Sequence, residues 1–155
     1  MLGNDIVDLK LAKIQSNWRR KGYLNKIFCD AEQAYILSSP KPDELVWKLW
    51  SLKEAAYKIY NRQTGIRTFE PRAILCDVAE LTTEIGEVNI NEETFFTKTV
   101  VTSNYVHSIA ALNLKDLQRS KIDIYRGSAK NFDYHGLSPQ SVSHHGDYLA
   151  LVDFS

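Results

Sequence analysis

The order in which helical and strand-like patterns follow one another constrains the fold of this chain more than any other feature. Residues 3–9 are β-branched at their centre and predict an opening strand. A helical pattern follows over residues 11–38, with one break at Gly22. The stretch 38–45 carries two prolines and an aspartate, which predicts a turn that starts a long helix ending near Asn61.

Beyond the long helix, the pattern changes to that of strands. Strands are predicted at about residues 72–79, 86–90, 95–103 and 106–114, with the last two joined as a hairpin. The stretch "KIDIYRGSAKNFDYHGLSPQS" has Gly, Ser and Pro spaced as in loops, and "VSHHGDYLALVDF" predicts a turn that feeds a last strand. Helices followed by strands, without βαβ alternation, predict an α+β fold in which an antiparallel sheet packs against helices, as a single domain over residues 1–155.

Composition and charge exclude several classes of function. The chain is 44% hydrophobic, which is typical of a folded, water-soluble protein. Its 19 basic and 19 acidic residues cancel, so no overall field attracts nucleic acid or an anionic membrane. A nucleic-acid binder that uses "NWRRKGY" and "YNRQTGIR" is disfavoured for this reason and for want of a matching fold motif. We therefore expect neither nucleic acid nor membrane as a partner.

The cysteines and the N-terminal sequence bear on the compartment. Cys29 and Cys76 lie far apart and outside any metal-ligand spacing, which predicts buried thiols in a reducing compartment. The start "MLGNDIVDLK" lacks a basic segment followed by an apolar run, and eighteen apolar residues never occur together. These features predict a cytoplasmic protein.

The stretch "WSLKEAAYKIY" is the centre of the predicted long helix, and it has two chemically different faces. At 100° per residue, Leu52, Ala56 and Ile59 share an apolar face, whereas Glu54 and Lys58 lie one turn apart on the other side among aromatic residues. Two interpretations are open. The pair is either an ordinary surface ion pair, which stabilises the helix by only about 0.2–0.5 kcal/mol, or a carboxylate and an amine that belong to a functional site.

Two further polar clusters lie near the ends of the chain. Asp5 stands in "GNDIVDL" on a strand that otherwise faces inward, where a carboxylate needs a partner or a cation, whereas Asp8 at the strand end is expected to be solvated. Near the C-terminus, "SVSHHG" brings Ser141, Ser143 and His144 together. Each cluster also has an ordinary structural interpretation, as an exposed strand end or as a turn with two histidines.

Taken together, these residues describe a site for a phosphate-bearing ligand. Asp5 and Glu54 are two carboxylates without neighbouring cysteines, which is the all-oxygen ligand set that Mg²⁺ prefers. The loop "QTGIR" offers Thr64, the backbone N–H groups around Gly65 and the guanidinium of Arg67 to an anion. The predicted ligand is a small molecule that contains a polyphosphate.

The order of the motifs along the chain is also that of a known protein family. "GNDIVDL", "FCDAEQ", "WSLKEAAYK" and "TGIR" resemble the G-x-D-[IV], F-x-x-x-E, W-[SA]-x-K-E-A-x-x-K and Gly-containing loop of the 4'-phosphopantetheinyl transferase superfamily. "SVSHHGDYLALV" is similar to the S-x-SH element of that family. The single set of motifs resembles the compact holo-acyl-carrier-protein synthase type more than the two-lobed type.

The resemblance implies an enzyme and assigns roles to its residues. Asp5 and Glu54 would hold Mg²⁺ on the pyrophosphate of coenzyme A, and the phosphopantetheine arm would pass to a serine of an apo acyl carrier protein with release of adenosine 3',5'-bisphosphate. The base that takes the serine proton is either Glu54 or a metal-bound water. The implied catalytic residues are Glu54, Lys58 and His144, and the implied coenzyme A contacts are Lys53, Lys58, Thr64, Gly65, Arg67, Ser143 and His144.

Several alternatives stay open within this resemblance. "YVHSIA" also aligns with the S-x-SH element and makes His107 a rival of His144. Val7 stands where two-lobed members carry a further acid, and Asn4 replaces the usual apolar residue, so a non-catalytic relative that binds coenzyme A or a carrier protein is the second hypothesis. The compact type forms a trimer, which makes a homotrimer the expected assembly.

Docking of the carrier protein calls for a basic patch. Acyl carrier proteins are acidic, and Leu11 stands where the compact type often has an arginine for this contact. The best basic run that the chain offers in compensation consists of Arg19, Arg20, Lys21 and Lys26.

Overall fold

A computed structural model describes residues 1–155 and contains five α-helices and eight strands. The helices are α1 (Leu9–Gln15), α2 (Tyr23–Ile27), α3 (Asp30–Ser38), α4 (Pro42–Thr64) and α5 (Leu114–Gln118). The strands are β1 (Leu2–Asp8), β2 (Ile74–Cys76), β3 (Ile85–Ile90), β4 (Glu93–Val101), β5 (Tyr105–Ala111), β6 (Ser120–Arg126), β7 (Ser141–His145) and β8 (Tyr148–Phe154). None of the helices combines the length and the apolar character that crossing a membrane requires.

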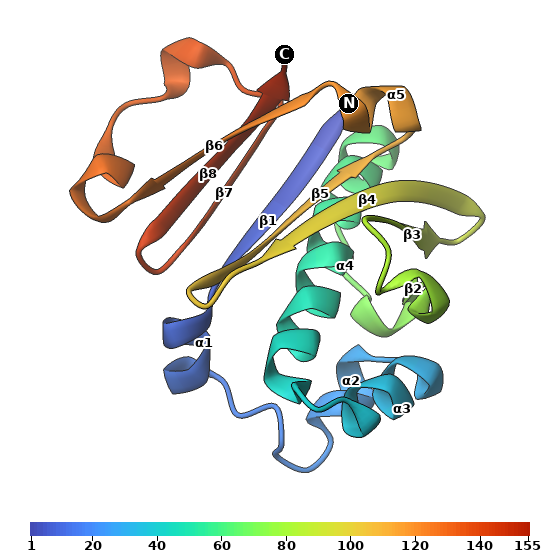
Figure 1. The fold of residues 1–155 in the computed structure, drawn as a ribbon. Helices are drawn as coiled ribbons and strands as arrows, with labels where there is room; N and C mark the ends of the chain where they lie inside the picture. The colour runs from blue at the N-terminus through green and yellow to red at the C-terminus, as the bar shows by residue number, and fades with distance from the viewer.

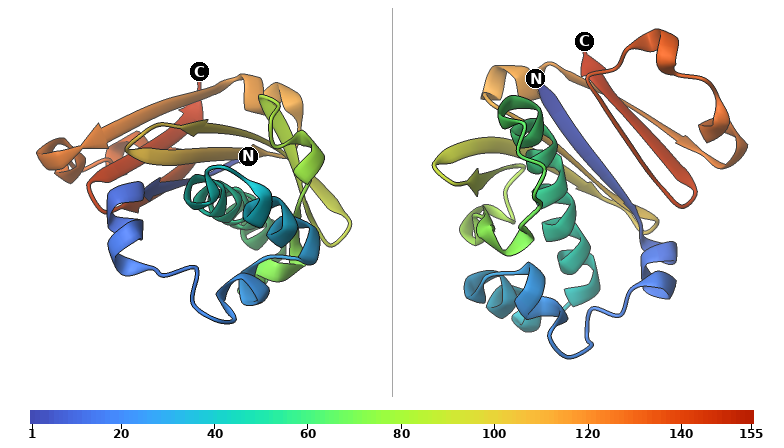
Figure 2. Two further views of the ribbon diagram at one scale, coloured as in Figure 1. Left: turned by 60° about the horizontal axis from the view of Figure 1, so that its bottom comes forward. Right: turned by 180° about the vertical axis from the view of Figure 1, so that it is seen from behind.

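The strands form two antiparallel sheets. The larger sheet has the order β1-β5-β4-β3-β2, and the smaller has the order β6-β8-β7. Figure 1 shows α4 along one face of the larger sheet and the smaller sheet beside β1, and the views in Figure 2 show that the strands curve around the helix. The predicted α+β class with an antiparallel sheet packed against helices is confirmed.

Helix α4 organises the main core because its apolar stripe faces the larger sheet. Pro42 at its first turn and Asp43 and Glu44 beside it favour the start, and Gly65 ends it in the left-handed conformation with φ of +71°. Its buried residues pack against Val88, Phe95, Val106, Ala110 and other residues of the larger sheet. A second, smaller core lies between β1, β5 and β8 and includes Leu2, Ile109 and Val152.

Gly3 allows β1 and α4 to approach each other closely. A Cβ atom at residue 3 would overlap the backbone carbonyl oxygen of Ala55 in α4 and would crowd Ile59. Any larger residue would therefore push the strand away from the helix. The contact brings Asp5, two residues further along β1, onto the same side as Glu54 and Lys58.

The structure corrects several predicted boundaries. The predicted strand 72–79 shrinks to β2, because Pro71 starts a 3₁₀ turn before it and the Asp77 side chain accepts from the N–H of Ala79 to start another after it. The helical region 11–38 is divided into three helices rather than broken once at Gly22. The stretch around 120–126, predicted as loop, is β6, and the turn before the last strand is preceded by β7, so the end of the chain is a hairpin.

Candidate functional site

Three charged side chains from β1 and α4 form the centre of the site. Lys58 and Glu54 lie near enough to Asp5 for their charges to affect its pKa, and the charges of Asp5 and Glu54 likewise affect the pKa of Lys58. Lys58 Nζ donates to the backbone oxygen of Asn4 at 2.6 Å, which fixes the amine beside the strand that carries Asp5. The structure therefore brings together the two predicted metal-binding carboxylates and the second predicted lysine.

Asp5 has two chemically different oxygens. Oδ1 accepts a hydrogen bond from Ser143 Oγ at 3.2 Å, whereas Oδ2 is buried without any hydrogen-bond partner. Burial raises the pKa of Asp5 to about 7, and the negative charge of Glu54 adds to the rise, while Lys58 and Ser143 oppose it. A buried carboxylate oxygen without a partner is costly, so the position is prepared for a cation.

Burial also perturbs the partners of Asp5. It raises the pKa of the Glu54 carboxyl, and the Lys58 charge opposes that rise. It lowers the pKa of the Lys58 amine, while the charges of Asp5 and Glu54 raise it. Two carboxylates that each resist ionisation and include one unpartnered oxygen suit a hard divalent cation such as Mg²⁺. Asp5 and Glu54 therefore fit the metal that the sequence motifs imply.

Strands β1 and β7 run side by side but are joined by side chains rather than by a backbone ladder. Three backbone N–H groups on the free edge of β1 donate to alternate side chains of β7: Asn4 to Ser141 Oγ at 2.9 Å, Ile6 to Ser143 Oγ at 3.0 Å, and Asp8 to His145 Nδ1 at 2.9 Å. We call this junction the β1–β7 seam. It satisfies the edge of β1 while it places Ser143 against Asp5.

Two basic residues of α4 close the same seam from the helix side. Lys58 Nζ donates to the backbone oxygen of Val142 at 3.1 Å, in addition to Asn4. Arg62 donates to the backbone oxygens of Leu2 and Gln140. Arg62 was missed in the sequence, although its position one turn after Lys58 places it on the same helix face.

Two cavities border this seam, and they differ in character. A cavity of about 390 Å³ contains Asp5 and is lined by Val7, Ala12, Tyr23, Trp47, Trp50, His144 and His145, among others. We call it the aromatic cavity. A second cavity of about 360 Å³ is lined by Tyr57, Lys58, Asn61, Arg62 and residues 139–142, and we call it the basic cavity. Along one face of α4 the side chains thus change from aromatic through acidic to basic.

The structure separates the two rival histidines. His144 is exposed on β7 and lines the aromatic cavity together with Asp5. His107 is only 1% exposed, its Nε2 shares a hydrogen bond of 3.0 Å with Asn4 Nδ2, and burial lowers its pKa to about 4. His107 therefore supports β1 from within the core and does not reach the cavity.

Lys53 does not belong to the site, contrary to the prediction that it binds phosphate. Its side chain is fully buried, and Nζ donates to Glu32 Oε1 at 2.7 Å and to the backbone oxygens of Pro71 and Ile74. Glu32 in turn accepts from the N–H groups of Cys29 and Cys76. The lysine and the F-x-x-x-E glutamate are thus a structural ion pair that ties α3 and β2 to α4.

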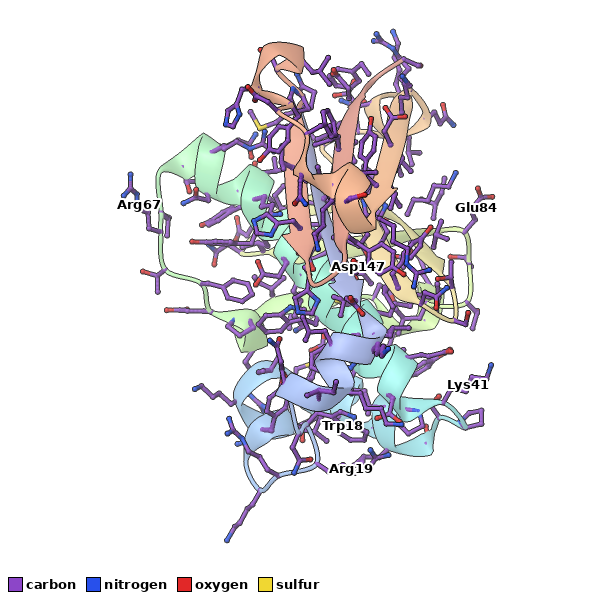
Figure 3. All side chains as sticks on the ribbon, turned by 90° about the vertical axis from the view of Figure 1, so that its left-hand side faces the viewer. Trp18, Arg19, Lys41, Arg67, Glu84 and Asp147 are labelled. Carbon is purple, nitrogen blue, oxygen red and sulfur yellow. The ribbon has the colours of Figure 1, made fainter.

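The loop after α4 does not form the predicted anion site. Thr64 Oγ1 donates to the Tyr60 oxygen at 2.7 Å and accepts from the N–H of Ile66, and the Gly65 N–H donates to the Asn61 oxygen. These groups complete the C-terminal end of α4, so they are not free for phosphate. Arg67 is exposed without a hydrogen-bond partner, and Figure 3 shows it extending outward from this loop.

Ser143 and Asp8 have supporting roles that the motifs did not reveal. The Ser143 hydroxyl accepts from Ile6 and donates to Asp5, so it positions the carboxylate and is not free for coenzyme A. Asp8, expected to be solvated, is buried: Oδ1 caps α1 by accepting from Lys10 and Leu11, and Oδ2 accepts from the N–H of Asp147.

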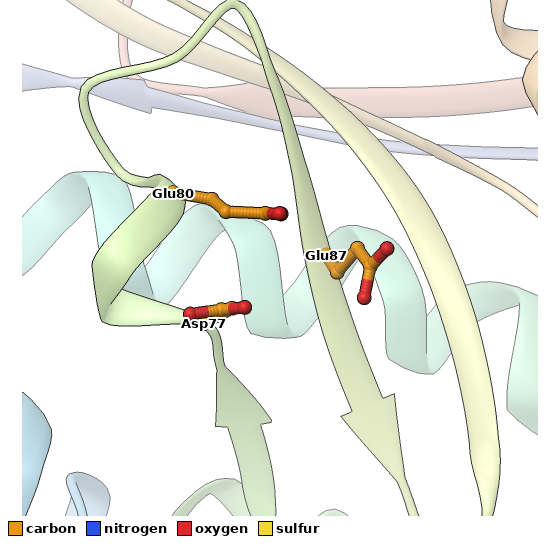
Figure 4. Close-up of side chains that lie close together, drawn as sticks. All are labelled: Asp77, Glu80 and Glu87. Carbon is orange, nitrogen blue, oxygen red and sulfur yellow. The ribbon is translucent and has the colours of Figure 1, made fainter.

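A separate group of carboxylates lies on the connection between β2 and β3. Asp77, Glu80 and Glu87 each place one oxygen within 4.8 Å of the others (Figure 4). Burial and the charges of Glu87 and Asp77 raise the pKa of Glu80. None of these residues lines either cavity of the site, so the group is distinct from the Asp5 and Glu54 pair.

Comparisons with known proteins agree with the motifs. The profile of the 4'-phosphopantetheinyl transferase superfamily matches residues 1–110. No curated protein sequence matches the chain. The fold is similar to that of the Helicobacter pylori holo-[acyl-carrier-protein] synthase in complex with coenzyme A, with a TM-score of 0.56, 13% identity, and coverage of 72% of this chain and 98% of that chain.

Two further solved structures share the fold. The Neisseria meningitidis holo-[acyl-carrier-protein] synthase gives a TM-score of 0.51 at 20% identity, with 70% of this chain and 94% of that chain covered. The Thermotoga maritima holo-[acyl-carrier-protein] synthase gives 0.55 at 11% identity, with 97% and 81% covered. Since the matching profile spans 110 of the 155 residues and includes Asp5, Glu54 and Lys58, the chain belongs to the 4'-phosphopantetheinyl transferase superfamily and is a transferase of that family.

Proposed function

We propose that this transferase moves the 4'-phosphopantetheine arm of coenzyme A to a serine hydroxyl of an apo acyl carrier protein and releases adenosine 3',5'-bisphosphate. The observation that carries the proposal is the Asp5 carboxylate, whose Oδ2 is buried without a partner and whose pKa the charges of Glu54 and Lys58 affect, in a member of this superfamily. The serine oxygen forms a new bond to the phosphorus that carries pantetheine. The bond from that phosphorus to the bridging pyrophosphate oxygen breaks, and the leaving oxygen keeps the electron pair.

Asp5 and Glu54 would hold a Mg²⁺ ion, which when bound stabilises the negative charge on the pyrophosphate oxygens. Ser143 keeps Asp5 in place through its hydrogen bond to Oδ1, so Oδ2 is the oxygen without a protein partner that can bind the ion. Because this arrangement exists before substrate arrives, little reorganisation is needed during the reaction.

Lys58 and His144 supply positive charge and hydrogen bonds to phosphate. Lys58 uses two of its three N–H donors on the carbonyls of Asn4 and Val142, which leaves one donor for a phosphate oxygen. His144 stands exposed on the wall of the cavity that holds Asp5, with no protein partner for its ring. Both groups are therefore available to the anion.

Glu54 is the proposed base for the serine proton. Its carboxylate has no hydrogen-bond partner in the protein, and burial raises its pKa. A carboxylate has two oxygens, so one can bind Mg²⁺ while the other accepts the proton. The same residue can thus take the proton from the serine hydroxyl as the new bond forms.

The carrier protein is proposed to dock over α1 and the loop that follows it. Lys10, Lys13, Arg20 and Lys21 are exposed there, and Ala12 and Ser16 of the same region line the aromatic cavity beside Asp5. Arg19 contributes less than its charge suggests, because it pairs with Asp43 at 3.1 Å and stacks on Trp18 (Figure 3). An acidic carrier on this surface brings its serine close to the site.

Assembly as a homotrimer is a further part of the proposal. It rests on the resemblance of the single motif set to the compact holo-acyl-carrier-protein synthase type. Light scattering at assay concentration tests it, and a monomer that is fully active would contradict it.

The decisive experiment for the proposed function is the mass of an apo acyl carrier protein after incubation with this protein, coenzyme A and Mg²⁺. We expect the carrier to gain the mass of one phosphopantetheine arm and an equal amount of adenosine 3',5'-bisphosphate to appear. If the protein binds coenzyme A and the carrier but leaves the carrier unmodified, it is a binding module instead. If it binds neither, the proposal is wrong.

A further inference from the structure

We propose, on the basis of the function inferred above, that the aromatic cavity receives the pantetheine arm of coenzyme A and that His145 donates a hydrogen bond from Nε2–H to an amide carbonyl of that arm. His145 follows the predicted S-x-SH residues and was given no role in the sequence motifs. Four observations carry the inference: the proton position on the ring, its fixed orientation, the lining of the cavity and its size.

The protein itself determines which nitrogen of His145 carries the proton. The backbone N–H of Asp8 donates to His145 Nδ1 at 2.9 Å, so Nδ1 must offer a lone pair. A neutral imidazole in this arrangement has its proton on Nε2, and no protein group bonds to that nitrogen. Burial lowers the pKa of His145, which keeps the ring neutral, although Asp8 opposes the effect. His145 therefore presents a hydrogen-bond donor and lacks a free acceptor.

The ring is held in place before any ligand binds. Asp8 anchors it through the backbone, and the Asp8 carboxylate in turn accepts from the N–H of Asp147 in the β7–β8 turn. Gly146 makes this turn possible, because its φ is +56° and a Cβ atom would overlap the Asp8 carboxylate. Figure 3 shows Asp147 at the tip of this hairpin, next to α1. A donor that is fixed in advance loses little entropy on binding.

The residues that line the aromatic cavity suit the pantetheine arm of coenzyme A better than its nucleotide. Tyr23, Trp47, Trp50 and Val7 give it apolar walls, whereas the basic cavity on the other part of α4 contains Lys58 and Arg62. Pantetheine is an uncharged chain with two amides and a dimethyl group, and the nucleotide carries the phosphates. Asp5 lies in the aromatic cavity next to the seam, so a ligand whose pyrophosphate lies at Asp5 has its arm on one side and its nucleotide on the other.

The size of the cavity argues against a segment of the carrier protein as the occupant. Its volume is about 390 Å³. A helix with side chains is about 10–12 Å across and rises about 5.4 Å per turn, so roughly one turn fills a space of this volume. An extended chain of the size of pantetheine fits within it, as small-molecule sites of about 300–1,000 Å³ commonly do.

The experiment compares two ligands that differ in the arm. Calorimetry with Mg²⁺ measures the affinities of coenzyme A and of 3'-phosphoadenosine 5'-diphosphate, which keeps the pyrophosphate but lacks pantetheine, for the wild-type protein and for the variants His145→Asn and His145→Gln. The asparagine side chain places its oxygen near the position of His145 Nδ1, so it can still accept from the Asp8 N–H. It has no group at the position of Nε2–H, so the proposed donor to the arm is lost. Gln places an NH₂ group near the position of Nε2 and keeps the donor. His135→Asn, at an exposed histidine far from the cavity, is the matched control.

We expect His145→Asn to weaken coenzyme A binding by about three- to tenfold, the usual effect of one lost hydrogen bond, and to leave the binding of 3'-phosphoadenosine 5'-diphosphate unchanged. His145→Gln should retain coenzyme A affinity better than His145→Asn. Equal losses for both ligands, or an unchanged coenzyme A affinity in His145→Asn, would overturn the inference.

A second measurement needs no variant. In the wild-type protein, the ¹⁵N-coupled Nε2 proton of His145 should shift on addition of coenzyme A and stay in place on addition of 3'-phosphoadenosine 5'-diphosphate. The same shift with both ligands would show that the ring does not contact the arm. A wild-type protein that binds coenzyme A no more tightly than 3'-phosphoadenosine 5'-diphosphate rejects the arm site and leaves the proposed transfer intact, whereas failure to bind either ligand rejects the transfer itself.

Discussion

Ser143 Oγ donates to Asp5 Oδ1 at 3.2 Å and leaves Asp5 Oδ2 buried without a partner. The same hydroxyl accepts from the N–H of Ile6, so one serine both holds the edge of β1 and orients the carboxylate on it. This relationship explains how a side-chain junction between two sheets can build a site: the β1–β7 seam that joins the sheets also determines which oxygen of Asp5 is left without a protein partner.

Replacing Ser143 by Ala tests the seam. The change removes the acceptor of the Ile6 N–H and the donor to Asp5, and we expect it to lower the free energy of unfolding by about 1–3 kcal/mol and to reduce transfer. Urea denaturation and carrier modification measure the two effects. Ser128→Ala, at an exposed serine without hydrogen bonds, is the control. Wild-type stability and turnover in Ser143→Ala would show that the seam does not depend on this hydroxyl.

Replacing Lys53 by Met tests whether that residue is structural. The change leaves the Glu32 carboxylate buried and unpaired, which typically costs about 3–5 kcal/mol in stability. Adding Glu32→Gln removes the second charge and should restore part of the loss, as thermal unfolding of the single and double variants can show. A stable Lys53→Met protein with selectively weakened coenzyme A binding would instead support the phosphate role predicted from the sequence.

His107 makes stability depend on pH. Its pKa is about 4 in the folded protein and 6.5 in the ordinary reference state, so between these values the unfolded chain binds a proton that the folded protein does not. The stability that neutral His107 provides is therefore present above about pH 6.5 and is lost as pH falls toward 4. His107→Gln, which keeps an acceptor for Asn4, should flatten this part of the curve of unfolding free energy against pH. Identical pH dependence in both proteins would contradict the account.

Gly146 is expected to be intolerant of any side chain. Alanine at this position has to adopt a left-handed backbone conformation and overlaps the Asp8 carboxylate, so we expect a loss of about 2 kcal/mol or more in the free energy of unfolding. Gly136→Ala is the matched control, because nothing lies within 4 Å of an added Cβ there and its φ is not positive. Similar denaturation midpoints for the two variants would contradict the structural role of the β7–β8 turn.

Local sequence patterns are enough to predict much of the fold. The opening strand, the long helix and the hairpin of β4 and β5 follow from periodicity and turn residues, and the structure confirms them, although the helix ends at Thr64 rather than near Asn61. Strand β6 was missed although "KIDIYR" alternates apolar and polar residues, because the Gly- and Pro-containing stretch after it dominated the pattern. The boundaries of β2 depended on the 3₁₀ turns beside it, which periodicity does not reveal.

The site could be predicted only in part, for a physical reason. The residues at the centre, Asp5, Glu54 and Lys58, follow from the motifs and from helix geometry. The burial of Lys53 depends on its ion pair with Glu32. The roles of Ser143, Arg62 and His145 depend on the β1–β7 seam, whose two strands are more than a hundred residues apart in sequence. Contacts of this kind arise from tertiary packing, so no local pattern encodes them.

The most direct test of the central claim, that Asp5 and Glu54 hold the metal ion for transfer, is the Mg²⁺ dependence of carrier modification in Asp5→Asn and Glu54→Gln. The amide variants keep the shape of the side chains and remove the charge, so we expect turnover to fall by orders of magnitude while the fold persists. Glu87→Gln, from the separate carboxylate group, should retain wild-type Mg²⁺ dependence. Full Mg²⁺-dependent turnover in both Asp5→Asn and Glu54→Gln, or its loss in Glu87→Gln alone, would contradict the account.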